Sequence, residues 1–362
     1  MSIITSAEAF LIDIPVETVR TDSVQAFLKQ ETPFVRIKTS EGLEGIGYSY
    51  TIGTGGTAVL AMLKDYLLPK LIGLDSKNVE QVWNQIYYST RATETGAITS
   101  LAVAAIDTAI WDLKCKRANE SLAVMAGGFR DRVPLYDTEG GWLHLTTEEL
   151  VAGAKASKAK GWPGIKLKVG KSNVHEDVER LTAVREAVGK DMHIMVDANT
   201  SFTLAEAKRR ATAFAPLDLF WFEEPMPADD VKSHAILAAA TSIPIAVGET
   251  MYSVQQFQQY LHQSAVGFVQ VDVARVGGIT PWLKVAHMAE AFNVKVCPHF
   301  LMEIHVSLTA AIPNGLYVEH IPQLRGITHT QMAIEAGNAM APTAAGLGID
   351  WDFDAIDGLR VS

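Results

Sequence analysis

Two lysines lie two positions apart in the stretch GIKLKVG, residues 164–170. If this stretch is a strand, Lys166 and Lys168 point to the same face, because side chains i and i+2 of a strand do so. Two ammonium groups that close together repel each other. One interpretation is an edge strand with a solvated lysine face. The other is an active site that needs both charges, and the rest of the sequence decides between them.

Carboxylates recur later in the chain at a constant interval. Asp197 and Glu223 are 26 residues apart, and so are Glu223 and Glu249, which is one strand-and-helix period each time. Three carboxylates at one barrel mouth would repel strongly unless a cation lay between them. Ligands that are all oxygens favour Mg²⁺, or Mn²⁺, over zinc. The spacing therefore predicts one divalent ion per chain, with coordination positions left for an α-hydroxy acid substrate.

A divalent ion would give the lysine pair a chemical function. A lysine beside a second ammonium and a metal, with little water around it, has a lowered pKa and can act as a base near neutral pH. Lys168, nearer the C-terminal end of the stretch GIKLKVG, is predicted to be this base. Lys166 is predicted to neutralise the substrate carboxylate and to perturb its neighbour.

Three further polar residues lie at or near the ends of short apolar segments later in the sequence. His299 is predicted to be a second proton-transfer group, and Asp272 to bind its far nitrogen, which would fix the tautomer and raise the basicity. Glu319 has two interpretations. It is either a buried, protonated acid that donates a hydrogen bond to the oxygen on which charge develops, or a solvated residue at the barrel rim. A zinc site that includes Glu303 and His305 is not favoured, because the spacing does not fit an H-E-x-x-H helix.

Eight short apolar runs carry these residues between about positions 133 and 321. They are VPLYDTE, GIKLKVG, HIMVDAN, LFWFEEP, PIAVGET, FVQVDVAR, VKVCPHF and YVEHI. The segments between them place apolar residues at helical spacing behind Thr, Asp or Ser starts. This alternation predicts a (β/α) barrel with a parallel inner sheet, whose active site lies at the C-terminal ends of the strands.

The sequence before the barrel has a different pattern. AEAFLIDIPVE, TPFVRIKTS and EGIGYSYT predict three strands joined by turns, and helices follow them, including TSLAVAAIDTAIWDLKCK. We expect an α+β capping domain over residues 1–128, the barrel over 129–325, and a segment, 326–362, that packs back on the cap. The stretch TIGTGGT lacks the P-loop lysine and the dinucleotide-binding spacing, so it is interpreted as a hinge or a close backbone approach.

The composition excludes several classes of partner. Over 362 residues the formal net charge is −10, which argues against binding to nucleic acid or to an anionic membrane. The two cysteines, Cys115 and Cys297, are too few for a disulfide framework and fit a reducing compartment. No run reaches the roughly 20 apolar residues of a membrane span, and Glu8 and Asp13 interrupt any signal-peptide core. A cytoplasmic enzyme is expected.

Taken together, these motifs resemble the enolase superfamily, in its mandelate racemase subgroup. KLK matches the Lys-x-Lys motif, VDAN, FEEP and VGET match the metal-ligand strands, VDVARVGG with CPHF matches the Asp/His dyad, and YVEH matches the electrophilic Glu. The stretch AAIDTAIWDLKCK also looks like a signature of the family's cap. The resemblance implies an α/β fold, a modified (β/α)7β TIM barrel with an N-terminal capping domain completed by the C-terminal segment.

The resemblance also implies roles for the residues. Mg²⁺ would bind to Asp197, Glu223 and Glu249, protons would move through Lys168 and the His299–Asp272 dyad, and Glu319 would stabilise an enediolate. Candidate residues for substrate contact or for support of the ligands are Asn199, Glu224, Arg20 and Glu139. The family resemblance further implies a homo-oligomer.

Several reactions share the first step that the resemblance implies, the loss of the proton α to a carboxylate. The leading hypothesis is β-elimination of water from an acid sugar, which gives a 2-keto-3-deoxy acid. YDTEGGWLH and PHFLMEIHVSL resemble the L-talarate/galactarate dehydratases of this subgroup. The alternatives are a racemase or epimerase of an α-hydroxy acid, a cycloisomerase of an anhydro sugar acid, and an inactive barrel used for binding.

Overall fold

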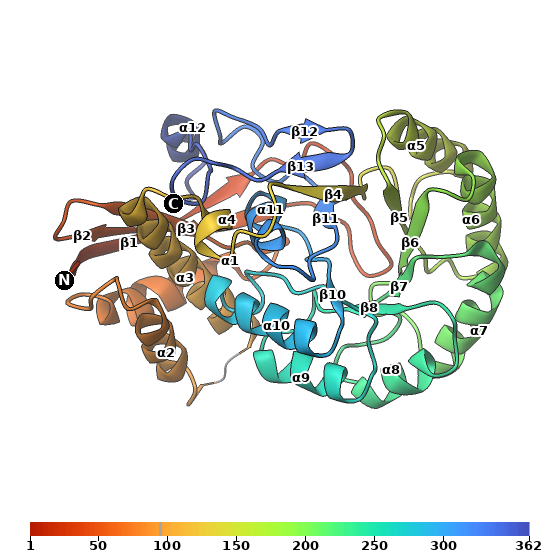
Figure 1. The fold of residues 1–362 in the computed structure, drawn as a ribbon, viewed down its shortest axis with the longest axis horizontal. Helices are drawn as coiled ribbons and strands as arrows, with labels where there is room; N and C mark the ends of the chain where they lie inside the picture. The colour runs from red at the N-terminus through yellow and green to blue at the C-terminus, as the bar shows by residue number, and fades with distance from the viewer. Residues whose placement is uncertain (94–95, 362) are drawn as a thin grey trace.

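The chain opens with a three-stranded antiparallel sheet, as the sequence predicts. It contains β1 (Ile4–Ile14), β2 (Gln30–Thr39) and β3 (Glu44–Tyr48). The structure is a computed structural model that describes residues 1–93 and 96–361. Figure 1 shows this sheet and its helices as a cap beside the barrel. The helices of the cap are α1 (Gly56–Ala61), α2 (Val79–Ser89), α3 (Ala97–Ala118) and α4 (Leu122–Met125).

Helix α3 packs closely against β3, because glycines on the strand leave room for its backbone. A Cβ atom at Gly47 would lie 2.1 Å from the backbone oxygen of Ala105, and one at Gly45 would lie 2.3 Å from that of Ala109. Neither distance is possible for real atoms. Glycine on the strand and alanine on the helix therefore fix how near the two elements lie.

Two buried acids on α3 join the cap to the rest of the molecule. Asp107 accepts hydrogen bonds from the backbone nitrogen (2.8 Å) and the hydroxyl (2.7 Å) of Thr280. Asp112 accepts them from the backbone nitrogens of Ile46 on β3 (2.9 Å) and Leu347 in the C-terminal segment (3.0 Å). The stretch AAIDTAIWDLKCK thus connects the cap sheet, the barrel and the end of the chain.

All eight predicted barrel strands are present, with a helix between each successive pair. Parallel ladders join β4 through β10 in order and join β11 to β4, and a parallel bridge joins Val296 of β10 to Gly315, just before β11. This is a (β/α)7β barrel. The strands are β4 (Arg132–Asp137), β5 (Gly164–Lys168), β6 (His193–Asp197), β7 (Trp221–Glu223), β8 (Ile245–Val247), β9 (Phe268–Val269), β10 (Lys295–Val296) and β11 (Val318–His320).

The barrel helices begin mostly where the sequence predicts. Side chains of Thr146, Thr203, Asp230 and Ser253 accept a hydrogen bond from a backbone N–H in the first turn, which satisfies a donor that the helix leaves free. The helices are α5 (Thr147–Ala159), α6 (Val174–Val188), α7 (Leu204–Phe214), α8 (Val231–Ala238), α9 (Val254–His262), α10 (Ile279–Ala291) and α11 (Met302–Ala311).

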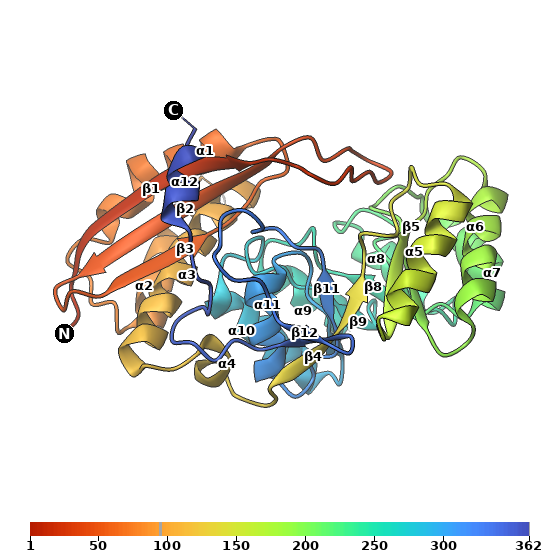
Figure 2. The ribbon, with the colours of Figure 1, turned by 90° about the horizontal axis from the view of Figure 1, so that it is seen from above.

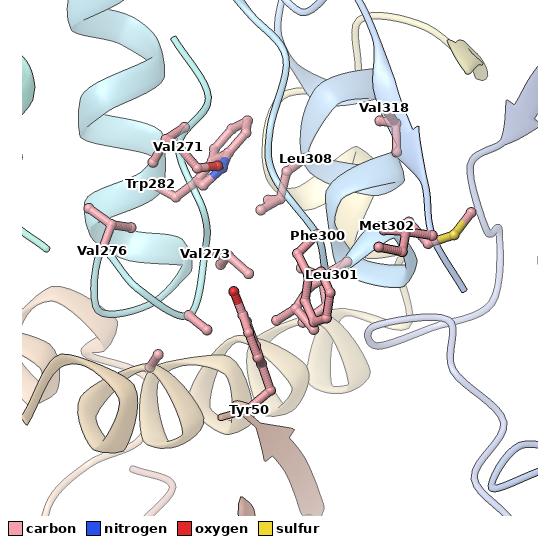
Figure 3. Close-up of a cluster of buried hydrophobic side chains, with 14 of the residues drawn as sticks. Tyr50, Val271, Val273, Val276, Trp282, Phe300, Leu301, Met302, Leu308 and Val318 are labelled. Carbon is pink, nitrogen blue, oxygen red and sulfur yellow. The ribbon is translucent and has the colours of Figure 1, made fainter. Parts of the chain in front are cut away.

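Strand β9 is shorter than the run FVQVDVAR that predicts it. Beyond Val269 the backbone bonds to side chains: the nitrogen of Val273 donates to Nε2 of His305 (3.1 Å), and the oxygen of Val271 accepts from Trp282 (3.1 Å). The valines of this turn remain buried in an apolar cluster, which Tyr50 enters from the cap (Figure 3). The alternation of apolar and polar residues here is typical of a strand, although these residues lie beyond the end of β9.

The C-terminal segment contacts both parts of the molecule. The hairpin of β12 (Ile334–Glu335) and β13 (Asn338–Met340) adds to the barrel sheet, where β13 lies antiparallel to β4. Helix α12 (Phe353–Gly358) lies beside the cap sheet (Figure 2). There the backbone nitrogen of Val361 donates to the oxygen of Leu11 (2.8 Å).

The connection between β1 and β2, residues 15–29, extends from the cap sheet toward the barrel (Figure 2). We call it the cap loop. Of the helices in the described part of the chain, including the 22-residue α3, none is long and apolar enough to cross a membrane.

Candidate active site

The two lysines of β5 lie in the interior of the barrel. Strand β5 pairs with β4 on one side and β6 on the other, and Lys166 and Lys168 are only 1% and 6% exposed. This excludes the edge-strand interpretation. Nζ of Lys166 lies 2.8 Å from Oε1 of Glu223, and Nζ of Lys168 lies 2.5 Å from Oδ2 of Asp197. Lys168 is therefore compensated by a carboxylate from the neighbouring strand β6, and Lys166 by one from β7, two strands away.

The three regularly spaced carboxylates meet at the C-terminal end of the barrel. Asp197 ends β6, Glu223 ends β7 and Glu249 follows β8, and each offers an oxygen within 4.8 Å of the others. All three are buried. Burial and the nearby Asp197 raise the pKa of Glu223 to about 7, which shows how costly three such charges are. A buried set of three oxygen donors fits a hard divalent cation such as Mg²⁺.

The pKa of Lys168 differs from the sequence-based expectation. Burial is the largest single influence and lowers this pKa, and repulsion by Lys166 lowers it further, but attraction by Asp197, Glu249 and Glu223 together outweighs both, so the net shift is upward. The protein groups alone therefore hold Lys168 in its protonated form. Its use as a base requires additional positive charge at the three carboxylates.

His299 is held by a buried acid, which in turn accepts a hydrogen bond from a phenol. Its Nδ1 lies 2.8 Å from Oδ2 of Asp272, and the hydroxyl of Tyr50 donates to the same oxygen (2.7 Å). The predicted contact between His299 and Asp272 is thus present. Burial would raise the pKa of Asp272, but the hydrogen bond and the charge of His299 lower it to about 2.

The other nitrogen of His299 faces the three carboxylates. Nε2 lies 3.3 Å from Oε2 of Glu249. Burial lowers the pKa of His299, but Glu249 and Asp272 raise it by more, so the net direction is upward, as expected for a histidine beside a carboxylate.

Glu319 matches neither of its two predicted states. It is buried, which excludes a solvated rim residue, and it accepts hydrogen bonds from Thr138 (2.7 Å) and from the backbone nitrogen of Phe300 (3.0 Å). Nζ of Lys166 lies 2.9 Å from its carboxylate. Burial alone would raise the pKa of Glu319, but Lys166 and His299 lower it well below its ordinary range. Glu319 is therefore an ionised partner of Lys166 and not a protonated donor.

Glu224 is a further buried acid of the site. Burial, and after it Glu249, raise the pKa of Glu224 well above its usual value, and its Oε1 contacts the hydroxyl of Thr250. Its Oε2 is buried without a hydrogen-bond partner among the described residues. The backbone here is strained: φ is +38° at Glu224, +42° at Asn199 and +61° at Thr200.

A cavity of about 140 Å³ lies between the cap and the barrel. Both lysines of β5, His299, Glu319, Glu249, Asn199 and Glu224 line its barrel side. From the cap, Asp22, Val24, Gln25, Phe27 and Ile52 line it. The predicted proton-transfer groups therefore open onto one cavity.

The cap loop is tied down over this cavity. The hydroxyl of Ser23 donates to the backbone oxygen of Ala198 (2.8 Å), and the oxygen of Thr21 accepts from the nitrogen of Leu143 (3.0 Å). The ring of Phe27 packs against Trp142, with ring centroids 5.7 Å apart.

Arg20 and Glu139, predicted as candidate substrate contacts, do not line the cavity. Their side chains pair with each other, and Nε of Arg20 lies 3.3 Å from Oε2 of Glu139. The indole nitrogen of Trp142 also donates to that oxygen (3.2 Å). The pair thus anchors the cap loop to the barrel beside the cavity.

Arg275 and Tyr50 belong to the site, although the sequence analysis assigned them no role. Nη1 of Arg275 donates to the backbone oxygen of Glu249 (2.8 Å), and its guanidinium carbon lies 5.7 Å from the centre of the Tyr50 ring. Arg275 follows Asp272 by three positions in VDVARVGG, so the motif itself contained the signal. Tyr50 lies just beyond a cap strand, and nothing local indicates its contact with Asp272.

The glycine-rich stretch TIGTGGT forms a close backbone approach. The nitrogen of Gly56 donates to Oε2 of Glu31 (2.9 Å), and a Cβ at Gly56 would lie 2.6 Å from that atom.

The two side chains considered for a zinc site have other partners. His305 accepts a backbone hydrogen bond, and Glu303 accepts hydrogen bonds from the backbone nitrogens of residues 323 and 324. Neither of these two side chains is placed to share a zinc ion with His299.

The fold and the site define a (β/α)7β barrel in which two lysines and a histidine open onto one cavity, beside three carboxylates that could hold a divalent ion. The chain belongs to the mandelate racemase/muconate lactonizing enzyme family of the enolase superfamily. Residues 4–127 match the family's N-terminal domain, described as "Mandelate racemase / muconate lactonizing enzyme, N-terminal domain", and residues 149–355 match "Enolase C-terminal domain-like". The family predicted from the motifs is confirmed.

Dehydratases and cycloisomerases are among the relatives of this chain. L-talarate/galactarate dehydratase of Salmonella typhimurium is 38% identical over 312 residues, which cover 86% of this chain and 78% of that protein. The 3,6-anhydro-alpha-L-galactonate cycloisomerase of Streptomyces coelicolor is 35% identical over 353 residues, covering 97% and 98%. The structure of L-talarate dehydratase from Polaromonas sp. JS666, complexed with Mg and L-glucarate, matches with a TM-score of 0.95 at 34% identity, covering 100% and 98%.

Proposed function

We propose that this protein is a Mg²⁺-dependent acid-sugar dehydratase that forms a 2-keto-3-deoxy acid and water. The observation that carries the proposal is the placement of two proton-transfer groups on different sides of one acidic site. Lys168 contacts Asp197, whereas Nε2 of His299 faces Glu249. Dehydration needs both a base for the α-proton and an acid for the leaving hydroxyl. The dehydratases among the relatives support this assignment.

The residues proposed to hold Mg²⁺, or Mn²⁺ in its place, are Asp197, Glu223 and Glu249. When bound, the ion supplies positive charge that competes for Asp197, lowers the pKa of Lys168 and stabilises negative charge developing on the substrate carboxylate. Lys166, held by Glu319 and Glu223, adds a fixed positive charge beside that carboxylate. Glu319 is therefore a positioning residue in this proposal.

The chain's own groups then move the protons. Nζ of Lys168 takes the proton from the α-carbon, and Nε2 of the protonated His299 gives a proton to the β-hydroxyl. The carbon–oxygen bond breaks with its electron pair and water leaves. The resulting enol gains a proton at the β-carbon and releases the proton of its α-hydroxyl, which gives the ketone. Asp272 and Tyr50 keep the imidazole oriented during the transfer. No external oxidant or reductant is needed.

A cycloisomerase is the second candidate, favoured by the relative that matches this chain over nearly its whole length. The same base and acid would serve. His299 would protonate the ether oxygen of an anhydro ring in place of a hydroxyl, so the ring would open and no water would be lost.

The proposal extends to the setting of the enzyme. We place it in the cytoplasm as a homo-oligomer, with residues 1–128, 129–325 and 326–362 as cap, barrel and closing segment. The two free cysteines fit a reducing compartment, and the net charge of −10 argues against a nucleic-acid or anionic-membrane partner.

Proton NMR in D₂O tests the proposed function directly. The purified protein with Mg²⁺ is incubated with open-chain acid sugars, 3,6-anhydro acid sugars and simple α-hydroxy acids. A 2-keto-3-deoxy product from an open-chain acid is expected, and the same type of product from an anhydro acid alone would favour the cycloisomerase. Deuterium at the α-carbon without elimination would show a racemase or epimerase, and no change in any acid would contradict all of these activities.

A further inference from the structure

We infer that the site selects acid sugars with a single carboxylate, the aldonates and their anhydro forms, over aldarates, which have a carboxylate at each end. This inference rests on the proposed function and concerns the part of the cavity beneath the cap loop. The two relatives are named for acids of different kinds: talarate and galactarate carry two carboxylates, and 3,6-anhydrogalactonate carries one. Family membership therefore does not decide the question.

The basic side chains of the cavity are all engaged at its barrel end. Lys166, Lys168 and Arg275 are the lysines and arginines that line it. Lys166 and Lys168 have carboxylate partners at 2.8 and 2.5 Å, and Nη1 of Arg275 lies 3.4 Å from Oε1 of Glu249. These groups surround the place where the reacting carboxylate of the substrate must bind. A second carboxylate at the far end of a sugar chain would not reach them.

Among the described residues, the cap end of the cavity carries an acid and no base. Of the five cap residues that line it, Asp22 is the only one that ionises. Its Oδ1 accepts hydrogen bonds from the backbone nitrogens of Val24 (2.7 Å) and Gln25 (2.8 Å), which fix the carboxylate in place. A fixed carboxylate accepts hydrogen bonds from sugar hydroxyls and repels a second carboxylate. This end therefore suits the polyol tail of an aldonate.

The two basic residues of the cap loop form ion pairs with acids that do not line the cavity. The guanidinium of Arg20 pairs with Glu139 and also donates to the backbone oxygen of Pro322 (3.4 Å), outside the cavity. Lys29 lies 3.1 Å from Glu31 and 3.4 Å from Asp13. Turning either side chain toward the substrate would leave its acidic partner uncompensated, at a cost that rises with burial.

The test compares kcat/KM for aldonates and aldarates matched in carbon number and in configuration at the reacting carbons. Keto acid formation by the full-length protein with Mg²⁺ is measured. The wild type is expected to prefer aldonates by about 100-fold or more, since an aldarate buries a second charge without a partner. Gln25→Arg, which adds a cation to the cavity wall, is expected to raise the aldarate-to-aldonate ratio about tenfold.

Two further variants make the test specific. Leu28→Arg adds the same charge to the same loop at a side chain that is 86% exposed and does not line the cavity, so the ratio should not change. Asp22→Asn should reduce the discrimination, because the repelling charge is gone, and it serves if Gln25→Arg does not fold.

The outcomes separate this inference from the proposed function. Equal or better turnover of aldarates by the wild type would overturn the inference, but it would not contradict the proposed dehydratase activity. An unchanged ratio in both Gln25→Arg and Asp22→Asn would overturn the assignment of the cap end. If no acid of either class loses water or exchanges its α-proton, the proposed function and the inference fail together.

Discussion

At the scale of single residues, the proposed mechanism divides proton transfer between Lys168 and His299. Lys168 opens onto the cavity from β5, and His299 opens onto it from the segment after β10. The two side chains contact different carboxylates of the acidic site, Asp197 and Glu249. Their roles can therefore be separated by experiment.

Exchange of the α-proton and loss of the hydroxyl should respond differently to two substitutions. Lys168→Met is expected to abolish both processes, because it removes the base. His299→Asn should lower product formation by about 10²–10⁴-fold while α-deuterium exchange continues, because the acid acts only in the second stage. Both rates are measured by NMR in D₂O with the acid sugar that the wild type converts.

Tyr50→Phe is a suitable comparison for the histidine variant. It removes only the hydroxyl that donates to Asp272 and leaves the imidazole in place. A smaller effect on the same stage as in His299→Asn is expected. Loss of exchange in His299→Asn, with exchange retained in Lys168→Met, would show that the two roles are reversed.

The sequence identified the residues of the site more reliably than their protonation states. The constant spacing of Asp197, Glu223 and Glu249 was sufficient to predict that they meet, because one βα period moves the chain by one strand. It could not show that Lys166 would lie 2.9 Å from Glu319 and keep that acid ionised. The state of a buried carboxyl depends on its nearest charge, and that neighbour comes from a distant strand.

At the scale of elements, helix α3 carries a buried acid into the contact between cap and barrel. Burial raises the pKa of Asp107 to about 7, well above its ordinary value of 3.8, although hydrogen bonds from Thr280 oppose the shift. A carboxyl whose pKa is raised on folding contributes stability that is present below pH 4 and lost as the pH rises through 7. Cap–barrel packing should therefore weaken across this range.

The variant Asp107→Asn tests this pH dependence, because it keeps the side chain neutral at every pH. From pH 5 to pH 8, the wild type's free energy of unfolding relative to that of the variant should fall by about 2–3 kcal/mol. Urea denaturation of both proteins at the two pH values gives this difference. A constant difference would show that Asp107 does not change its charge on folding.

Element boundaries were predictable where a strand and its apolar run end together. The run HIMVDAN and strand β6 end close to the same point, so Asp197 was placed correctly at the end of a strand. Strand β9 ends at Val269, and Asp272 lies on the turn after it. Side chains of His305 and Trp282 replace the neighbouring strand as hydrogen-bond partners there, and local periodicity does not encode such long-range partners.

At the scale of the whole molecule, cap and barrel together line the cavity, and Glu249 of the acidic site opens onto it. The carboxylates of Asp197, Glu223 and Glu249 are buried close to one another, so a divalent cation that binds only to the folded state should stabilise the whole chain. At a concentration 100 times its dissociation constant, the gain is about 2.7 kcal/mol. For a chain of this size we expect a rise in the melting temperature of several degrees.

Thermal melting of the protein after treatment with EDTA, with and without millimolar Mg²⁺, measures this gain. Asp197→Asn should lose the response, because one of the three oxygen ligands loses its charge. Asp191→Asn is the matched control: it makes the same acid-to-amide change at an exposed residue just before the opposite end of β6, and it should respond like the wild type. A wild-type protein that melts at the same temperature in EDTA and in Mg²⁺ would contradict the metal site, and the dehydratase mechanism that depends on it would have to be abandoned.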